Sequence, residues 1–382
     1  MWMGLMGGLA ALGLVGLGVW RWMGRPLYQP GDARRHLLAS SAPERATIPD
    51  LRASSPRREN ENHWAESADP WTMAPGIRLH HFESGQGDDV LVVHGGPGLP
   101  LRQSLAGLRP LEDRFRFHYY DQRGCGRSTR PFDRFAGASF YANMQKLEGT
   151  LGLAAQVADI ERIRLTLGRD RITIVGHSFG GFLAALYAAE FPERVRGLVL
   201  VAPAAVLVLP SPDGGLFAEV ERRLPADRIA DYRAFLRDSF DFRHLFERSE
   251  ADLVALHARL VPFYVEAVGS EGSAVPESRT EDGGGFMVEA QYLSMGRRHD
   301  YRPALARVSA PTLVLHGDRD LQSVETTAVY RDAIPGARLV SFEGSGHFPF
   351  LEQPERFAEV VGPFLDGLPK DDSGHLGSSG PK

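Results

Sequence analysis

Ser178 has the chemistry of a nucleophile and a sequence context that would expose it. It lies within Val175–Gly181, VGHSFGG, which contains the pattern G-x-S-x-G. In this pattern a strand turns sharply into a helix and lifts the serine hydroxyl clear of the sheet. Only residues as small as Gly176 and Gly180 leave room for such a turn. The segment therefore predicts an exposed nucleophilic serine.

The elements on both sides of the serine fit this prediction. Ile172–Val175 is a short β-branched run typical of a buried strand, and apolar side chains recur at helical spacing over Phe179–Phe191, which Pro192 closes. An ordinary turn between a strand and a helix is the alternative.

A nucleophilic serine needs a base and an acid that orients the base, and both are expected later in the chain. The apolar run Pro311–Leu315 leads into a loop with two aspartates, of which we choose Asp320 over Asp318 as the acid. The next predicted strand, Arg338–Phe342, leads into a glycine-rich loop that holds His347, our candidate base. The alternative for the aspartates is a capping role at the following helix.

The tetrahedral intermediate of such a reaction needs backbone N–H donors for its oxyanion. The run Val90–Val93 leads into His94–Gly98, HGGPG, whose glycines can bring amides close to a ligand. We expect one donor from Gly96 or its neighbour and the second from Phe179, directly after the nucleophile. A plain tight turn is the alternative for the glycine loop.

Three motifs occur together and in order: HGGPG at His94–Gly98, DQRGCGRS at Asp121–Ser128 and GHSFGG at Gly176–Gly181. With them the chain resembles α/β-hydrolases of the proline iminopeptidase type, over residues 77–368. The resemblance implies an α/β-hydrolase fold with Ser178, Asp320 and His347 as catalytic triad and Gly96 and Phe179 as oxyanion donors.

The resemblance also points to a substrate-binding residue. Aminopeptidases of this family bind a free amine with acidic side chains, one of them in an E-x-x-Y segment, and Val288–Leu293 resembles that segment. Glu289 is therefore a candidate carboxylate for a substrate ammonium. The alternative is an exposed helix carboxylate.

Other residues of the DQRGCGRS motif are expected to be structural. Asp121 and Arg123 are interpreted as residues that pin the loop through ion pairs. Cys125 is the single cysteine, so an intrachain disulfide is impossible, and we expect a small packed side chain.

Composition is that of an ordinary globular protein. The chain has 382 residues, which is more than one compact core usually needs. A hydrolase sheet of about 250 residues interrupted by a lid would account for most of this length. The net charge is −5 and does not indicate the basic stripe that is expected of a nucleic-acid-binding protein. No metal-ligand cluster is evident, and the expected chemistry needs no cofactor.

Strand and helix patterns alternate along the chain, which predicts a mainly parallel sheet with helices on both faces. Between the strand after the nucleophile and the aspartate loop, helical patterns dominate and predict an inserted lid. The expected strands are Ile77–Phe82, Val90–Val93, Phe115–Tyr120, Ile172–Val175, Val195–Val201, Thr312–Leu315 and Arg338–Phe342. The expected units are a transmembrane anchor (1–24), a tether (25–70), the core (71–205 and 307–368), the lid (206–306) and a disordered tail (369–382).

The N-terminal stretch Met1–Trp20 contains no charged side chain and is long enough to span a bilayer. We expect a retained single-pass membrane anchor. A cleaved signal peptide is the alternative, and the membrane side of the enzyme stays open.

These patterns together predict a serine hydrolase that works by acyl transfer on a small molecule or short peptide. The leading expectation is an aminopeptidase that releases an N-terminal residue from short peptides or aminoacyl amides. Alternatives are an esterase or lactonase on small acylated metabolites, or a non-catalytic scaffold that only binds a ligand. The oligomeric state stays open.

Overall fold

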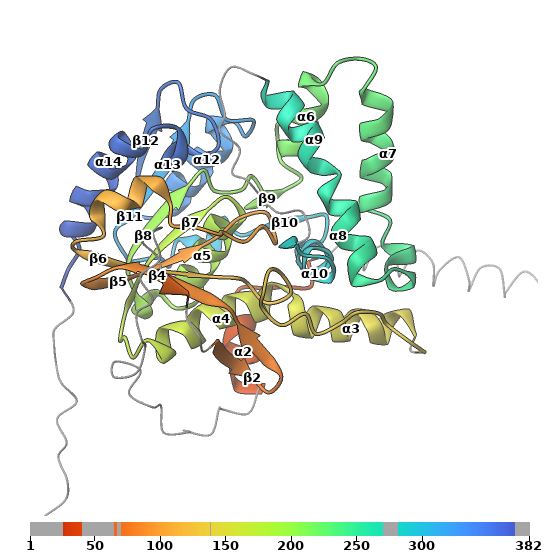
Figure 1. The fold of residues 1–382 in the computed structure, drawn as a ribbon, viewed down its shortest axis with the longest axis horizontal. Helices are drawn as coiled ribbons and strands as arrows, with labels where there is room; N and C mark the ends of the chain where they lie inside the picture. Colours follow the sequence, from red (N-terminus) through yellow and green to blue (C-terminus); the bar gives the residue numbers. More distant parts are fainter. Residues whose placement is uncertain (1–25, 40–64, 67–69, 138, 270–281, 371–382) are drawn as a thin grey trace, which may run out of the picture.

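The computed structural model describes residues 26–39, 65–66, 70–137, 139–269 and 282–370. Its centre is an eight-stranded sheet in the order β1-β4-β6-β5-β7-β8-β11-β12 (Figure 1). The six strands from β6 to β12 are mutually parallel, and β1 and β4 add an antiparallel edge. The expected mainly parallel sheet is thus confirmed. The strands are β1 (Ala65–Glu66), β4 (His81–Gly85), β5 (Asp88–Val93), β6 (Phe115–Tyr120), β7 (Ile172–His177), β8 (Val195–Val201), β11 (Thr312–Gly317) and β12 (Arg338–Phe342).

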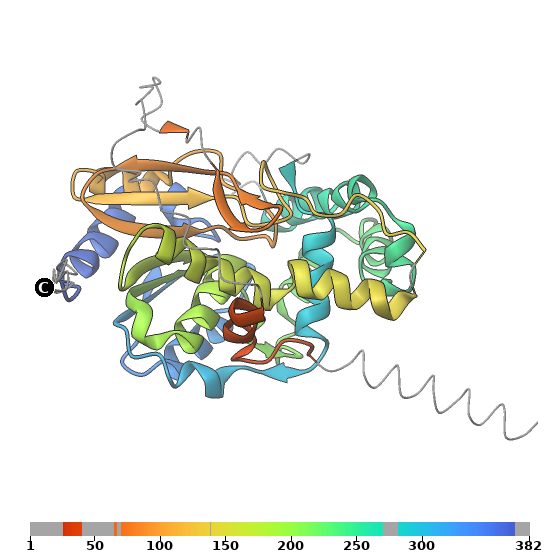
Figure 2. The same ribbon diagram turned by 90° about the horizontal axis from the view of Figure 1, so that it is seen from below.

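Successive side chains of the central strands are buried on opposite faces, as the period of a strand requires. In β5, Leu91 and Val93 join one core and Val90 and Val92 the other. Helices cover both faces (Figure 2). The first core contains α4 (Leu153–Thr166), α5 (Phe179–Glu190), α11 (Arg302–Leu305) and α12 (Val324–Ala333), and the second η1 (Ala106–Leu111), α13 (Pro349–Glu352) and α14 (Pro354–Asp366).

The expected strand Ile77–Phe82 is two strands. β3 (Ile77–Leu79) pairs with β2 (Trp71–Ala74) in a separate two-stranded sheet, whereas β4 pairs with β6. Between them, the carbonyl of His80 accepts a hydrogen bond from the Asp121 amide at 2.9 Å. The chain changes sheets at this residue, so one apolar run serves two pairings.

A helical insertion separates β8 from β11 and lies beside the sheet in Figure 1. It comprises α6 (Gly215–Arg223), α7 (Ile229–Ser239), η3 (Phe242–Glu247), α8 (Glu250–Ala258), α9 (Leu260–Val268) and α10 (Phe286–Met295), with the strand pair β9 (Val208–Leu209) and β10 (His299–Asp300) at its base. The stretch Glu250–Val268 forms two separate helices, α8 and α9. Pro262 lacks the N–H that would bond to Ala258 and its ring would clash with that carbonyl, so the helix breaks between the two.

The last helix of the insertion, α10, differs from the others because it is almost wholly buried. It packs against α3 (Phe140–Leu151) and α4, and its apolar side chains share one cluster with those of α3 and α6 to α9. It therefore links the insertion to the sheet domain.

Part of the expected tether is bound to the core, contrary to the expectation for 25–70. Tyr28 is fully buried and its hydroxyl donates to the Glu190 carboxylate, while Arg34 Nε donates to the Glu190 carbonyl at 2.6 Å. Helix α2 (Asp32–Ala39) packs on α4. Burial of an aromatic ring outweighs the polar composition of this stretch.

The predicted anchor lies outside the described residues, as does all but the first two residues of the predicted tail. In the ranges given above, no helix combines the length and the apolar composition that crossing a membrane requires.

Substitution of Gly180 tests the tight contact between α5 and the end of β5. A Cβ at Gly180 would lie 2.1 Å from the Val93 carbonyl oxygen, so Gly180→Ala should lower the free energy of unfolding by about 1–3 kcal/mol or more. Gly149→Ala is the matched control, because a Cβ there meets nothing within 4 Å and alanine favours a helix by about 1 kcal/mol. Urea unfolding of both variants measures the difference, and equal stability would refute the packing described.

Candidate active site

Ser178 lies at the turn between β7 and α5 in a strained conformation, with φ 53° and ψ −122°. Its amide donates to the Val201 carbonyl at 2.9 Å. A Cβ at Gly176 would lie 2.6 Å from the Gly180 carbonyl oxygen, so the turn requires glycine. Ser178 is partly exposed while its neighbours His177 and Phe179 are buried. The structure thus holds this serine in the conformation that the motif predicts.

Asp320 and His347 are brought together at the carboxyl ends of β11 and β12. His347 Nδ1 lies 2.8 Å from Asp320 Oδ2, and both side chains are buried. Asp318 has a different task, since its Oδ1 accepts from the Gly344 amide at 2.7 Å. The two aspartates therefore have different contacts, with Asp320 beside the histidine and Asp318 on the loop backbone.

The loop that holds His347 is fixed by contacts from two sides. A Cβ at Gly317 would lie 2.0 Å from the Gly346 carbonyl oxygen, so the end of β11 touches the loop backbone. On the other side, the Glu352 carboxylate accepts from Ser345 Oγ at 2.6 Å and from the Gly346 amide. These contacts set the direction of the imidazole.

His177 connects the nucleophile turn to this loop, a role that we did not anticipate. Its Nε2 lies 3.0 Å from the His347 carbonyl oxygen, and the two rings are 4.8 Å apart between centroids. Burial, followed by the charge of His347, lowers the pKa of His177 well below its usual value, so the neutral ring donates this bond. No local pattern signals this contact, because His177 and His347 are 170 positions apart in the chain.

The glycine loop after β5 passes directly beside Ser178. A Cβ at Gly95 would lie 2.8 Å from the Ser178 Cβ, and Gly96 has φ +118°. Phe179 occupies the first position of α5, where a helix leaves its amide without an internal acceptor. Backbone amides from Gly96 and Phe179 therefore come from segments that meet at the serine.

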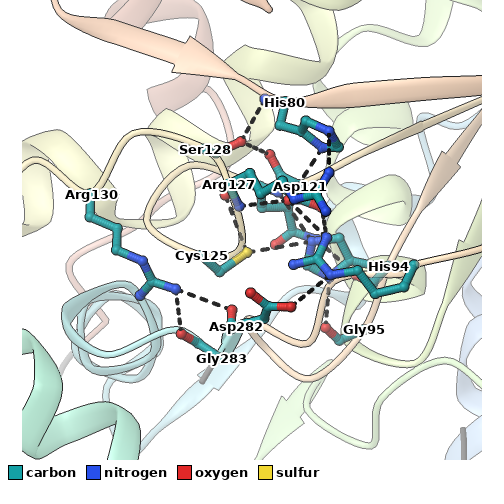
Figure 3. A network of polar contacts seen from close by, with 12 residues as sticks. His80, His94, Gly95, Asp121, Cys125, Arg127, Ser128, Arg130, Asp282 and Gly283 are labelled. Carbon is teal, nitrogen blue, oxygen red and sulfur yellow. Dashed lines mark hydrogen bonds and ion pairs between the residues drawn. The ribbon is translucent and has the colours of Figure 1, made fainter. Parts of the chain in front are cut away.

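The glycine loop is held from behind by the DQRGCGRS motif (Figure 3). Gln122 donates from its amide to His94 Nε2 at 3.1 Å and from its side chain to the His94 carbonyl at 2.7 Å. Asp121 Oδ1 accepts from Arg102 at 3.0 Å, and Arg123 pairs with the buried Asp159.

Cys125 lies within the same network, with its Sγ 3.7 Å from His94 Nε2 (Figure 3). Its Sγ donates to the Gln122 carbonyl at 3.2 Å, and burial raises the pKa of the thiol. The motif therefore stabilises the loop and leaves no reactive thiolate.

A pocket lies between the glycine loop and the helical insertion, and it reaches the loop at Gly96. Ser178, Asp320 and His347 lie outside its lining. Most lining side chains are apolar, among them Leu99, Phe217, Phe235, Phe240, Val254 and Val288. The segment before α10 closes one side, because the Gly284 amide donates to the Gly98 carbonyl at 2.9 Å and Arg130 donates to the Gly283 carbonyl at 2.9 Å (Figure 3).

Glu289, the candidate amine-binding residue, is 2% exposed and lies behind the pocket wall. Its Oε1 is 2.9 Å from His257 Nε2, and His257 lines the pocket. The Nδ1 atom of the same ring is 2.9 Å from the Gly284 carbonyl oxygen. The carboxylate is therefore buried, unlike the exposed alternative, and already has a partner.

Comparison with known proteins agrees with this architecture. A family model for the alpha/beta hydrolase fold matches residues 89–354. A proline iminopeptidase of Heyndrickxia coagulans is 28% identical over 298 residues, which cover 75% of this chain and 93% of that protein.

Two solved structures have a similar fold. Proline iminopeptidase from Mycobacterium smegmatis has a TM-score of 0.53 at 22% identity, covering 79% of this chain and 98% of its own. An esterase from Exiguobacterium antarcticum has a TM-score of 0.52 at 21% identity, covering 76% of this chain and 97% of its own.

The buried His94 makes stability depend on pH. Burial lowers its pKa from 6.5 to about 4, so the unfolded chain binds a proton in this window that the folded chain does not. The free energy of unfolding should therefore fall as the pH falls from 6.5 to 4, by about 3 kcal/mol from this residue. Urea unfolding at several pH values should show a shallower slope for His94→Gln than for the wild type. An identical slope would show that His94 does not contribute.

Proposed function

Because the chain belongs to the alpha/beta hydrolase fold family, we propose that it is a serine hydrolase with Ser178 as nucleophile, His347 as base and Asp320 as the residue that orients the base. The hydrogen bond of 2.8 Å between His347 Nδ1 and Asp320 Oδ2 carries this proposal. It fixes the imidazole with Nδ1 as donor and leaves Nε2 free to accept a proton. The strained, partly exposed Ser178 follows β7 at the same edge of the sheet.

The proposed reaction proceeds through an acyl-enzyme. Ser178 Oγ attacks the substrate carbonyl while His347 takes the hydroxyl proton and then passes it to the leaving group. Asp320 stabilises the imidazolium that forms. Water, deprotonated by His347, then attacks the acyl-enzyme; the bond between Ser178 Oγ and the acyl carbon breaks, His347 returns the proton to Oγ, and the acid is released. The backbone amides of Gly96 and Phe179 would hold the oxyanion in both steps.

The helical insertion would act as a lid. Tyr264 of α9 lies with its ring 6.4 Å from that of His347, and its hydroxyl is buried. Helices α6 to α9 also contribute Phe217, Phe235, Val254 and Leu260 to the pocket lining. Such a cover would exclude water from the acyl-enzyme until the expelled leaving group has left the pocket.

The first substrate class is a short peptide or aminoacyl amide with a free N-terminus. The iminopeptidase relatives favour it, and Glu289 provides a buried carboxylate next to the pocket. The second class is a small ester or other acylated metabolite. The apolar lining of the pocket favours it, since an uncharged acyl chain gains by leaving water.

Substitutions of the three proposed residues test the mechanism on a prolyl arylamide and a short-chain aryl ester. Ser178→Ala should abolish turnover of whichever substrate the wild type cleaves, and Asp320→Asn should reduce kcat by about 10⁴-fold, because the imidazole loses its oriented tautomer. Asp318→Asn is the matched control and should keep most of the activity, since that carboxylate contacts only the loop backbone. Unchanged turnover in Ser178→Ala would refute the proposed function.

A further inference from the structure

The geometry of the pair formed by His257 and Glu289 determines how many protons the two side chains share. The two ring nitrogens of His257 each lie 2.9 Å from an oxygen, the Gly284 carbonyl on one side and Glu289 Oε1 on the other. A carbonyl oxygen only accepts, so Nδ1 must carry a hydrogen. If the ring held only that hydrogen, the Nε2 lone pair would face a carboxylate lone pair at 2.9 Å.

One more proton must therefore lie between Nε2 and Oε1. It belongs either to an imidazolium beside a carboxylate or to a carboxylic acid beside a neutral imidazole. Both arrangements have a net charge of zero. The surface that the pocket presents at His257 is therefore neutral as a whole, although it contains the acidic residue that the sequence singled out.

Two further carboxylates lie near this wall without lining the pocket, and both are also paired. Asp282 Oδ2 accepts from Arg102 Nε at 2.8 Å, and Glu250 forms an ion pair with Arg130. In the part of the wall that the structure describes, a substrate ammonium finds no unpaired carboxylate. It would have to displace His257 from Glu289, which costs a desolvated, charge-assisted hydrogen bond.

We propose that His257 is the specificity-determining residue of the pocket: it neutralises Glu289 and so favours uncharged, apolar acyl groups over acyl groups with a free amine. This inference rests on the hydrolase function proposed above and decides between its two substrate classes. Removal of the His257 side chain would expose the charge of Glu289 and turn the same pocket toward ammonium-bearing substrates.

The test uses two aryl esters that differ in one group. One is the ester of proline and the other that of cyclopentanecarboxylic acid, in which a CH₂ replaces the ring NH₂⁺. The ratio of kcat/KM for the proline ester to that for the carbocyclic ester isolates the response to charge. For the full-length wild type we expect a ratio below one.

The substitution His257→Gln retains a side-chain amide that can donate to Glu289 but removes the extra proton. It should raise the ratio at least tenfold. His244→Gln is the matched control, because His244 also pairs with a carboxylate, Asp241 at 3.1 Å, but lies outside the pocket. Its ratio should equal that of the wild type. An unchanged ratio in His257→Gln, with wild-type melting temperature, would overturn the inference.

Glu289→Gln keeps the test decisive if the His257 variant does not fold. A neutral pair predicts that this change leaves the ratio close to that of the wild type. A tenfold fall would show that the native carboxylate already binds the ammonium and would overturn the inference. Hydrolysis of neither ester by the wild type, with Ser178 inert to a fluorophosphonate, would instead refute the proposed function.

Discussion

The close approach of three backbone segments at Ser178 is the constraint on which the rest of the site depends. Strand β7, helix α5 and the loop after β5 meet there at distances that exclude a Cβ at Gly95, Gly176 and Gly180. The contact gives the serine its positive φ and places the glycine loop within reach of any group bound to Oγ. Strain of this kind persists only where the surrounding packing determines it.

The parallel sheet turns this local contact into a complete site. Strands β5, β7, β11 and β12 all end at the same edge, so residues far apart in sequence converge there. The loops then require their own supports. Glu352 fixes the loop of His347, His177 connects that loop to the nucleophile turn, and Gln122 holds the glycine loop. Much of the polar chemistry around the site is thus used for positioning.

The sequence was sufficient for those parts of the site that depend on local rules. The motif around Ser178, the chain order of Asp320 and His347 and the apolar runs of the central strands were read from it, and the structure brings Asp320 and His347 together. It was insufficient where distant side chains decide the outcome. The residues around Tyr28 do not show that its hydroxyl donates a hydrogen bond to Glu190, 162 positions away. This bond holds part of the expected tether against the core.

The substrate pocket was the least predictable part for the same reason. Glu289 was identified by resemblance, but its partner His257 is 32 positions away on another helix, and only the tertiary fold brings them together. The pairing makes family resemblance and local chemistry point to different substrates. The resemblance to proline iminopeptidases suggested a free amine, whereas the proposed neutral pair and the apolar lining favour an uncharged acyl group.

The central claim is that Ser178 is a nucleophile activated by the folded site, and covalent labelling tests it most directly. The full-length protein is treated with a fluorophosphonate, digested and analysed by mass spectrometry. We expect a single adduct on the peptide that contains Ser178, formed by the native protein and absent after unfolding in urea. An unlabelled Ser178 in the native protein, or an adduct on another serine, would contradict the account.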